Sequence, residues 1–133
     1  MRLVLDSSVL IAASISRAGV CAELLEDILT HHELIISDFI VEEVSRTLRE
    51  KFKYPKTEIA ELCRFLLNAA LLVEPTEIDP SACRDPEDVH ILGTAVAASA
   101  DLLISVDKNL LTLVSFQGIP IVKPGEFWKR TTS

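Results

Sequence analysis

The chain has 133 residues, of which 49% are hydrophobic and 25% are charged, and its formal net charge is −7. This length suits one compact domain spanning residues 1–133, and the hydrophobic content excludes an intrinsically disordered chain. Phosphate affinity comes from cations, so the acidic balance argues against a simple DNA-binding module, but it does not exclude a nuclease that carries divalent metal ions.

Short apolar runs alternate with helical patterns along the whole chain. The predicted strands cover residues 2–5, 34–36, 71–73, 102–105 and 119–122. The predicted helices cover about 9–16 and 21–30, a helix opened by Ser37-Asp38, then about 57–70 and 85–100, with a short helical turn after Asp107 and a short segment after Pro124-Gly125. Strands separated by helices predict an α/β fold with a mostly parallel five-stranded sheet covered on both faces.

Acidic side chains stand where these predicted strands give way to helices. Asp6 directly follows the first strand, Asp107 follows the fourth, and Asp88 begins a helix in a strand-to-helix connection. In parallel sheets, active sites form beyond the carboxyl ends of the strands. Each of these acids also has a simpler explanation, because Asp6 and Asp107 suit helix N-caps and Asp88, three residues after Asp85, suits the first turn of a helix.

Glu43 lies well inside its predicted helix, where capping cannot explain it. On a helical wheel it lies somewhat nearer the apolar stripe than its neighbour Glu42, although the margin is modest. If Glu43 joins the other three acids at one edge of the sheet, their mutual repulsion raises their pKa values unless something offsets it. Oxygen ligands of this kind suit Mg²⁺ or Mn²⁺ and not zinc.

Four segments carry a resemblance to a known family: LVLDSSVLI, EEVSRTL, RDPEDVHILGTAVAASADLLISVDKNLL and IPIVKPGEFW. They are similar to the PIN domain family, and more narrowly to the VapC-like toxin components of prokaryotic toxin–antitoxin pairs. The resemblance implies a three-layer α/β/α sandwich and a Mg²⁺- or Mn²⁺-dependent endoribonuclease. By position, the catalytic and metal-binding acids are Asp6, Glu43, Asp88 and Asp107. It also implies a homodimer and a cognate antitoxin whose C-terminal segment occupies a groove near the acids.

The chain departs from the family pattern at three positions. Ser8 stands where many members have Asn, Ser105 where Thr is common, and Asn109 where a further Asp is frequent. We expect Ser7, Ser8, Ser105 and Asn109 to orient the acids or a metal-bound water by hydrogen bonds. The missing fifth charge leaves the number of bound metal ions open.

The segment 46–56 is locally basic in an acidic chain. One interpretation is a solvated surface, and the other is a contact surface for RNA phosphates formed by Arg46, Arg49, Lys51 and Lys53. No role is assigned to His90. The favoured function is RNA hydrolysis by metal-activated water, and the alternative is a weak or inactive PIN-like interaction module. An aspartyl-phosphate enzyme would need Asp-x-Asp after the first strand, where Ser8 stands here.

The three cysteines, Cys21, Cys63 and Cys83, form no CxxC pair, and no histidine completes a zinc pattern. An odd number of cysteines argues against a disulfide framework, so we interpret them as buried free thiols in a reducing cytoplasm. The apolar N-terminus is interrupted by Asp6, and no apolar run approaches the roughly 20 residues that span a bilayer. We therefore expect a cytoplasmic protein without membrane contact.

Overall fold

Six strands form one sheet in the order β3-β2-β1-β4-β6-β5 in the computed structural model, which describes residues 1–131. The strands are β1 (Arg2–Leu5), β2 (Glu33–Ile36), β3 (Leu71–Leu72), β4 (Leu102–Ile104), β5 (Ser115–Phe116) and β6 (Ile119–Val122). All neighbouring pairs are parallel except β5 and β6. Strand β1 lies between β2 and β4, and its residues Leu3, Val4 and Leu5 have no exposed surface, as expected of a parallel strand covered on both faces.

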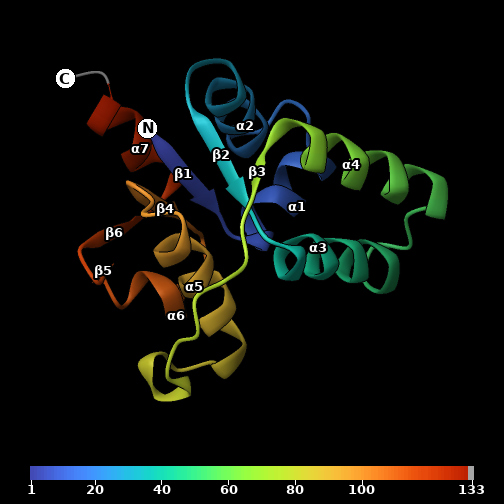
Figure 1. Cartoon of the computed structure of the whole chain (residues 1–133). Helices are drawn as coiled ribbons and strands as arrows, with labels where there is room; N and C mark the ends of the chain where they lie inside the picture. Colours follow the sequence, from blue (N-terminus) through green and yellow to red (C-terminus); the bar gives the residue numbers. More distant parts are fainter. Residues whose placement is uncertain (132–133) are drawn as a thin grey trace.

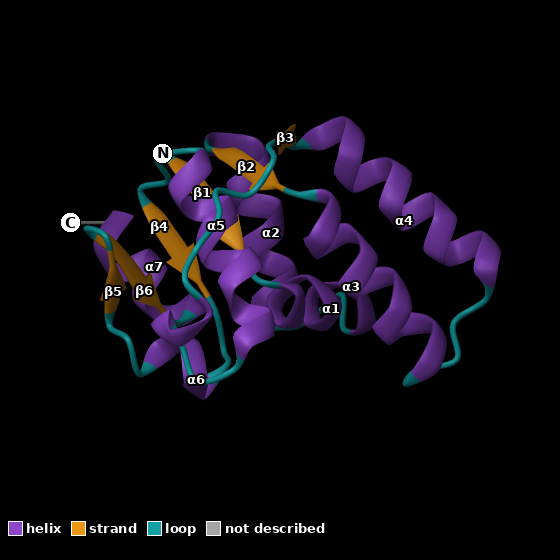
Figure 2. Cartoon of the chain, turned by 60° about the horizontal axis from the view of Figure 1, so that its bottom comes forward, coloured by secondary structure: helices purple, strands orange, loops and turns teal. Residues whose placement is uncertain are grey.

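Helices cover both faces of this sheet, which gives the three-layer α/β/α sandwich predicted from the sequence (Figures 1 and 2). The helices are α1 (Ser7–Ile15), α2 (Val20–His31), α3 (Asp38–Glu50), α4 (Lys56–Ala69), α5 (Val89–Ala97), α6 (Lys108–Leu111) and α7 (Pro124–Thr131), with single 3-10 turns η1 (Pro80–Ala82) and η2 (Pro86–Asp88). Helices α2 and α7 contact each other on one face, while α5 packs on β1 and β2 from the other. Helices α3 and α4 pack together and extend beyond the sheet beside α1.

The predicted count of five strands is wrong by one, because a short antiparallel hairpin forms at the edge of the sheet. Ser115 and Phe116 pair with Pro120 and Ile119 across a two-residue turn at Gln117 and Gly118. Both turn residues have positive φ, 48° and 82°, the backbone that a tight hairpin of this twist requires. The strand β5 is only two residues long, which is too short to show an alternating pattern in the sequence.

The helix predicted for 85–100 is also modified. Its first turn, Pro86–Asp88, is a 3-10 turn capped by the Asp85 carboxylate, which accepts from the Glu87 N–H at 3.0 Å. The α-helix proper ends at Ala97, before the predicted boundary, and Ser99 then takes a left-handed backbone with φ of 50°. The last predicted segment forms a complete helix, α7, whose Phe127 is fully buried.

The cysteines are free, as predicted, but only Cys83 is buried, whereas Cys21 and Cys63 are half-buried. Within residues 1–131, no single helix is long and apolar enough to cross a bilayer. Helices α1 and α2 have the length and apolar composition of a membrane span only when they are taken together, and they are bent by 108° at the break between them.

Gly93 fixes the path of the loop that leaves β3. This loop crosses α5 closely enough for the Thr76 N–H to donate to the Gly93 carbonyl at 3.0 Å, as the yellow-green strap of Figure 1 shows. A Cβ atom on Gly93 would lie 2.2 Å from the Thr76 carbonyl oxygen. Glycine in mid-helix is therefore required here by the close approach of a second backbone.

We expect Gly93→Ala to destabilise the protein by about 1–3 kcal/mol, because the loop must shift to relieve the clash. Gly125→Ala is the matched control, since a Cβ there meets no atom within 4 Å and alanine favours helix α7. Chemical denaturation of both variants measures the difference. Equal stability of the two variants would show that the loop is not held against α5.

Candidate active site

Asp6 lies at the carboxyl end of β1 and begins helix α1. Its side chain is 2% exposed, and its Oδ1 accepts from the Val9 N–H at 3.1 Å, so the predicted N-cap role is confirmed. The hydroxyls of Ser8 and Ser105 also donate to its Oδ1 and Oδ2. Burial raises the pKa of Asp6, and the charge of Asp107 raises it further, while these hydrogen bonds oppose the rise.

Ser105 connects Asp6 with Asp107 at the end of the neighbouring strand, β4. Its hydroxyl donates to Asp6 and accepts from the Asp107 N–H at 2.9 Å, and the residue has no exposed surface. Asp107 in turn caps helix α6, because its Oδ1 accepts from the Asn109 N–H at 2.8 Å. Asn109 therefore contacts Asp107 through its backbone N–H, and its side chain makes no hydrogen bond to this acid.

Glu43 reaches the same edge from the middle of α3. It is half-buried, and the Ser7 hydroxyl at the start of α1 donates to its Oε1. Glu42 is exposed, so the structure places Glu43 and not its neighbour toward the other acids. As the helical wheel predicted, Glu43 lies next to the apolar stripe of α3, where Ile40 and Val44 are fully buried.

Asp88 is the acid whose environment is least compensated. It is 7% exposed, and its Oδ2 is the buried side-chain oxygen or nitrogen atom within residues 1–131 that lacks a hydrogen-bond partner. Asp85 provides the cap of this turn, so capping does not explain Asp88. The pKa of Asp88 is raised to about 7, first by burial and then by the charges of Asp107, Asp85, Asp6 and Glu43.

A buried polar contact joins the two helices that carry Glu43 and Asp88. The hydroxyls of Ser37, before α3, and Thr94, in α5, lie 2.8 Å apart, and neither residue has exposed surface. Next to them, the rings of Phe39 and His90 stack with centroids 4.1 Å apart. His90 therefore has a packing contact between α3 and α5, which the sequence did not reveal.

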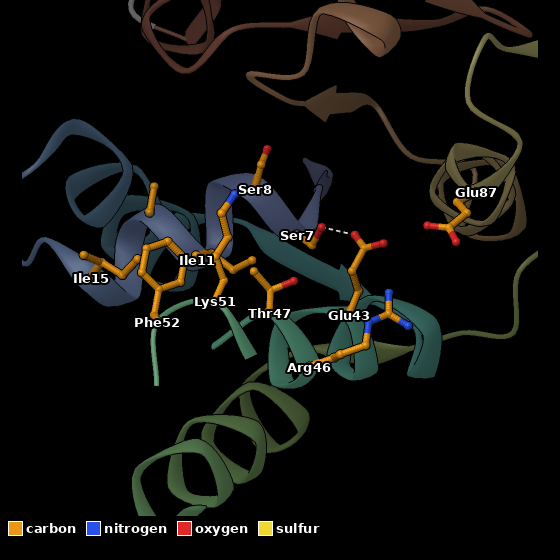
Figure 3. Close-up of a pocket in the computed structure, with 11 residues that line it drawn as sticks. Ser7, Ser8, Ile11, Ile15, Glu43, Arg46, Thr47, Lys51, Phe52 and Glu87 are labelled. Carbon is orange, nitrogen blue, oxygen red and sulfur yellow. Dashed lines mark hydrogen bonds between the residues drawn. The ribbon is translucent and has the colours of Figure 1, made fainter. Parts of the chain in front are cut away.

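A groove of about 520 Å³ lies between α1 and α3 and reaches one of the four acids, Glu43 (Figure 3). Of the four predicted RNA-contact residues, Arg46 and Lys51 line it, with Ser7, Ser8 and Glu43. Arg49 and Lys53 are not among the lining residues, and Arg49 approaches Glu50 at 3.8 Å. The basic segment is therefore divided between the groove and the outer surface of the α3 end.

The donor set suits a hard divalent cation. In the described part of the chain, no three carboxylate, imidazole or thiolate groups are arranged to hold an ion directly. However, the partnerless Oδ2 of Asp88 and its raised pKa show a buried carboxylate that nothing in the chain compensates. A cation would supply that compensation, and Mg²⁺ commonly binds through one or two carboxylates together with water molecules.

Residues 2–109 match the family model of the PIN domain. The chain belongs to the PIN domain family. No curated protein sequence matches it. Among solved structures, this PIN domain is similar to VapBC2 from Rickettsia felis bound to a DNA fragment from their promoter, with a TM-score of 0.64 and 15% identity over 92% of this chain and 98% of that chain. It is also similar to PAE2754 from Pyrobaculum aerophilum, with a TM-score of 0.66 and 15% identity over 98% of this chain and 88% of that chain.

These comparisons confirm the family and the fold that the sequence motifs implied. At 15% identity, the two structural likenesses concern the fold alone. The family match extends from residue 2 to residue 109, so it includes all four acids of the site, Asp6, Glu43, Asp88 and Asp107. The roles of individual acids therefore rest on the geometry described above.

The uncompensated carboxylate gives a pH prediction for the metal-free protein. Asp88 has a pKa of about 7 in the folded state against 3.8 for an ordinary Asp, so between these values the folded state binds the extra proton. Stability in EDTA should therefore fall as the pH rises from 4 to 7. Asp88→Asn removes the buried negative charge that destabilises the folded state at high pH. This variant should melt at least about 3 °C higher than the wild type at pH 8, with no difference near pH 4.

Thermal unfolding across this pH range, in EDTA, measures the effect. Added Mn²⁺ should stabilise the wild type at pH 8 and leave Asp88→Asn less affected, because metal binds the deprotonated acid. A difference between the two proteins that is the same at pH 4 and pH 8 would contradict the assignment of the effect to the Asp88 charge.

Proposed function

We propose that this PIN-domain protein is a Mg²⁺- or Mn²⁺-dependent endoribonuclease that hydrolyses phosphodiester bonds in RNA. The carrying observation is the buried, partnerless carboxylate oxygen of Asp88 among Asp6, Glu43 and Asp107. A folded protein keeps such a repelling group when a cation binds there. We assign the metal to these four acids, with Asp6 and Asp107 as the principal ligands.

When bound by these acids, a divalent ion would lower the pKa of a water molecule and neutralise charge on the phosphate. The chain's own residues orient the groups around it. Ser8 and Ser105 fix both oxygens of Asp6, and Ser7 fixes Glu43. These hydroxyls donate to carboxylates that the metal needs, so they act as orienting groups and no side-chain nucleophile is required.

Arg46 and Lys51 supply the positive charge that an acidic protein otherwise lacks for its substrate. Both line the groove that begins at Ser7 and Glu43. In a chain with a net charge of −7, cations placed beside the acids can attract RNA phosphates while the metal neutralises the acids themselves. This arrangement favours a nuclease over a passive nucleic-acid binder.

The proposal extends to the biological role. The fold likeness to VapBC2, which is bound to a DNA fragment from the promoter of its own components, supports a role as the toxin of a toxin–antitoxin pair. We accordingly propose a cognate antitoxin, a homodimer and a cytoplasmic location. A catalytically weak or inactive PIN-like module that only binds partners is the competing function.

The first test is cleavage of labelled single-stranded RNA by the purified protein. We expect cleavage with Mn²⁺, none with EDTA, and a loss of about a hundredfold or more in Asp6→Asn, because removing even a residue that orients a metal ligand typically costs 10–100-fold. Asp101→Asn is the matched control, since Asp101 is an exposed acid that bonds the Arg2 N–H at the opposite end of the sheet.

Cleavage that survives in Asp6→Asn would indicate a contaminating nuclease. No cleavage by the wild type, together with no rise in melting temperature on adding Mn²⁺, would favour the interaction module. A working site should gain stability with Mn²⁺ because the metal binds only the folded state.

The pair Glu43 and Glu42 tests the orientation of α3. Glu43→Gln should lower kcat/KM by about tenfold or more, because the Ser7-bound carboxylate loses its charge beside the metal. Glu42→Gln makes the same chemical change one position away on an exposed surface and should leave activity intact. The reverse result would show that Glu42 is the functional acid, and equal activity in both variants would remove Glu43 from the site.

A further inference from the structure

The groove beside the acids has two chemically distinct ends. Figure 3 shows Glu43, Arg46 and Glu87 at one end and Ile15 with Phe52 at the other. Ile15 and Phe52 are each 41% exposed, so the apolar end of the groove is accessible to a ligand. The groove volume of about 520 Å³ lies within the range of ligand-sized clefts, roughly 300–1,000 Å³.

The backbone holds Phe52 at the groove by a specific ending of α3. Lys53, directly after Phe52, has a left-handed backbone with φ of 57°, a conformation that residues other than glycine rarely adopt. The Tyr54 N–H then donates to the Leu48 carbonyl at 3.0 Å, and Tyr54 packs against the core. This turn keeps Phe52 beside the groove although much of its ring remains in water.

The cations of the groove are available to an anionic ligand. Within residues 1–131, Arg2, Arg49 and Arg130 approach acidic partners at 3.1, 3.8 and 4.0 Å, but neither Arg46 nor Lys51 does so. Both lie between the acids and Phe52 along α3, one on each side of Thr47 in the sequence. An aromatic face next to unpaired cations is the combination that single-stranded nucleic acid uses, with bases stacked on the ring and phosphates on the cations.

We propose that the groove between α1 and α3 binds an unpaired nucleotide next to the cleaved phosphate, with its base stacked on Phe52 and its backbone held by Arg46 and Lys51. This proposal rests on the proposed ribonuclease function and adds to it a binding position for one unpaired base. A base within a duplex has both faces covered by neighbouring bases, so it cannot use Phe52. The groove is continuous with the acids through Ser7 and Glu43, which places the nucleotide beside the site of cleavage.

The test is fluorescence anisotropy with a labelled eight-nucleotide single-stranded RNA, with Ca²⁺ in place of Mn²⁺ and a gel to show that the RNA stays intact. Phe52→Ala should raise Kd about tenfold or more, as removal of a stacking ring does elsewhere. Phe52→Trp should keep the wild-type Kd, and Phe52→Leu should bind as weakly as Phe52→Ala, because stacking needs a ring and not only an apolar side chain. A duplex of the same sequence should bind the wild type and Phe52→Ala equally weakly.

Phe65→Ala is the matched control, since Phe65 is 49% exposed on α4 and does not line this groove. It should leave Kd unchanged, and melting temperatures of all variants check that the fold is intact. A second readout places the nucleotide: an RNA with an abasic residue next to the cut should lose affinity for the wild type but lose nothing further for Phe52→Ala.

Three outcomes overturn the proposal. If Phe52→Ala binds RNA as Phe65→Ala does, or if the wild type binds no RNA, no base is held on Phe52. An unchanged Kd in Phe52→Ala together with Mn²⁺-dependent cleavage that Asp6→Asn abolishes would remove the stacking site and keep the nuclease. Phe52→Leu binding like the wild type would also overturn stacking, and would indicate that an apolar contact without a ring is sufficient to hold the RNA.

Discussion

Repulsion among carboxylates at the carboxyl edge of the sheet is the constraint on which the site depends. Parallel pairing of β1 with β4 brings Asp6 and Asp107 to adjacent strand ends, and the Ser37–Thr94 contact joins the helices that bring Glu43 and Asp88 beside them. Serine hydroxyl groups stabilise two of these acids, since Asp6 accepts hydrogen bonds from two serines and Glu43 accepts one. Asp88 receives none, and its buried Oδ2 has no hydrogen-bond partner within residues 1–131.

This distribution explains why capping and metal binding need not compete. Asp6 caps α1 through Oδ1 and Asp107 caps α6 through Oδ1, so each acid is held in place by the first turn of the helix it begins. A carboxylate has about four lone-pair directions, and a cap uses only one of them. The cap therefore restricts the rotamer of the acid. At Asp107 the remaining lone pairs stay available to a cation, whereas at Asp6 the hydroxyls of Ser8 and Ser105 use two more and leave about one. Preorganisation of this kind lowers the entropy lost on binding metal.

Much of the fold could be predicted from local sequence patterns, because buried parallel strands and capped helices each have a recognisable pattern within a short stretch of sequence. The strand-end positions of Asp6 and Asp107 were predictable for that reason. The contacts that assemble the site were not, since Ser105 meets Asp6 across 99 positions and Thr94 meets Ser37 across 57. The hairpin of β5 and β6 was not predicted because Ser115–Phe116 is too short to show an alternating pattern, although Gln117-Gly118 indicates a tight hairpin turn. Phe52 was passed over because a single Phe in a basic run gives no hint of which side chains surround it.

The acidic character of the chain then acquires a physical meaning. A protein with a net charge of −7 repels RNA over most of its surface, so attraction is confined to places where cations are unpaired or metal is bound. Arg46 and Lys51 line the groove between α1 and α3 together with Glu43, which would repel a phosphate unless the four acids hold a cation. In the proposed nuclease, metal loading would thus control RNA binding as well as chemistry, because without metal the same acids repel a phosphate. Phe52 adds an attraction at the far end of the groove that does not depend on charge, which gives the groove a means of holding RNA before and after the cleaved phosphate has been released.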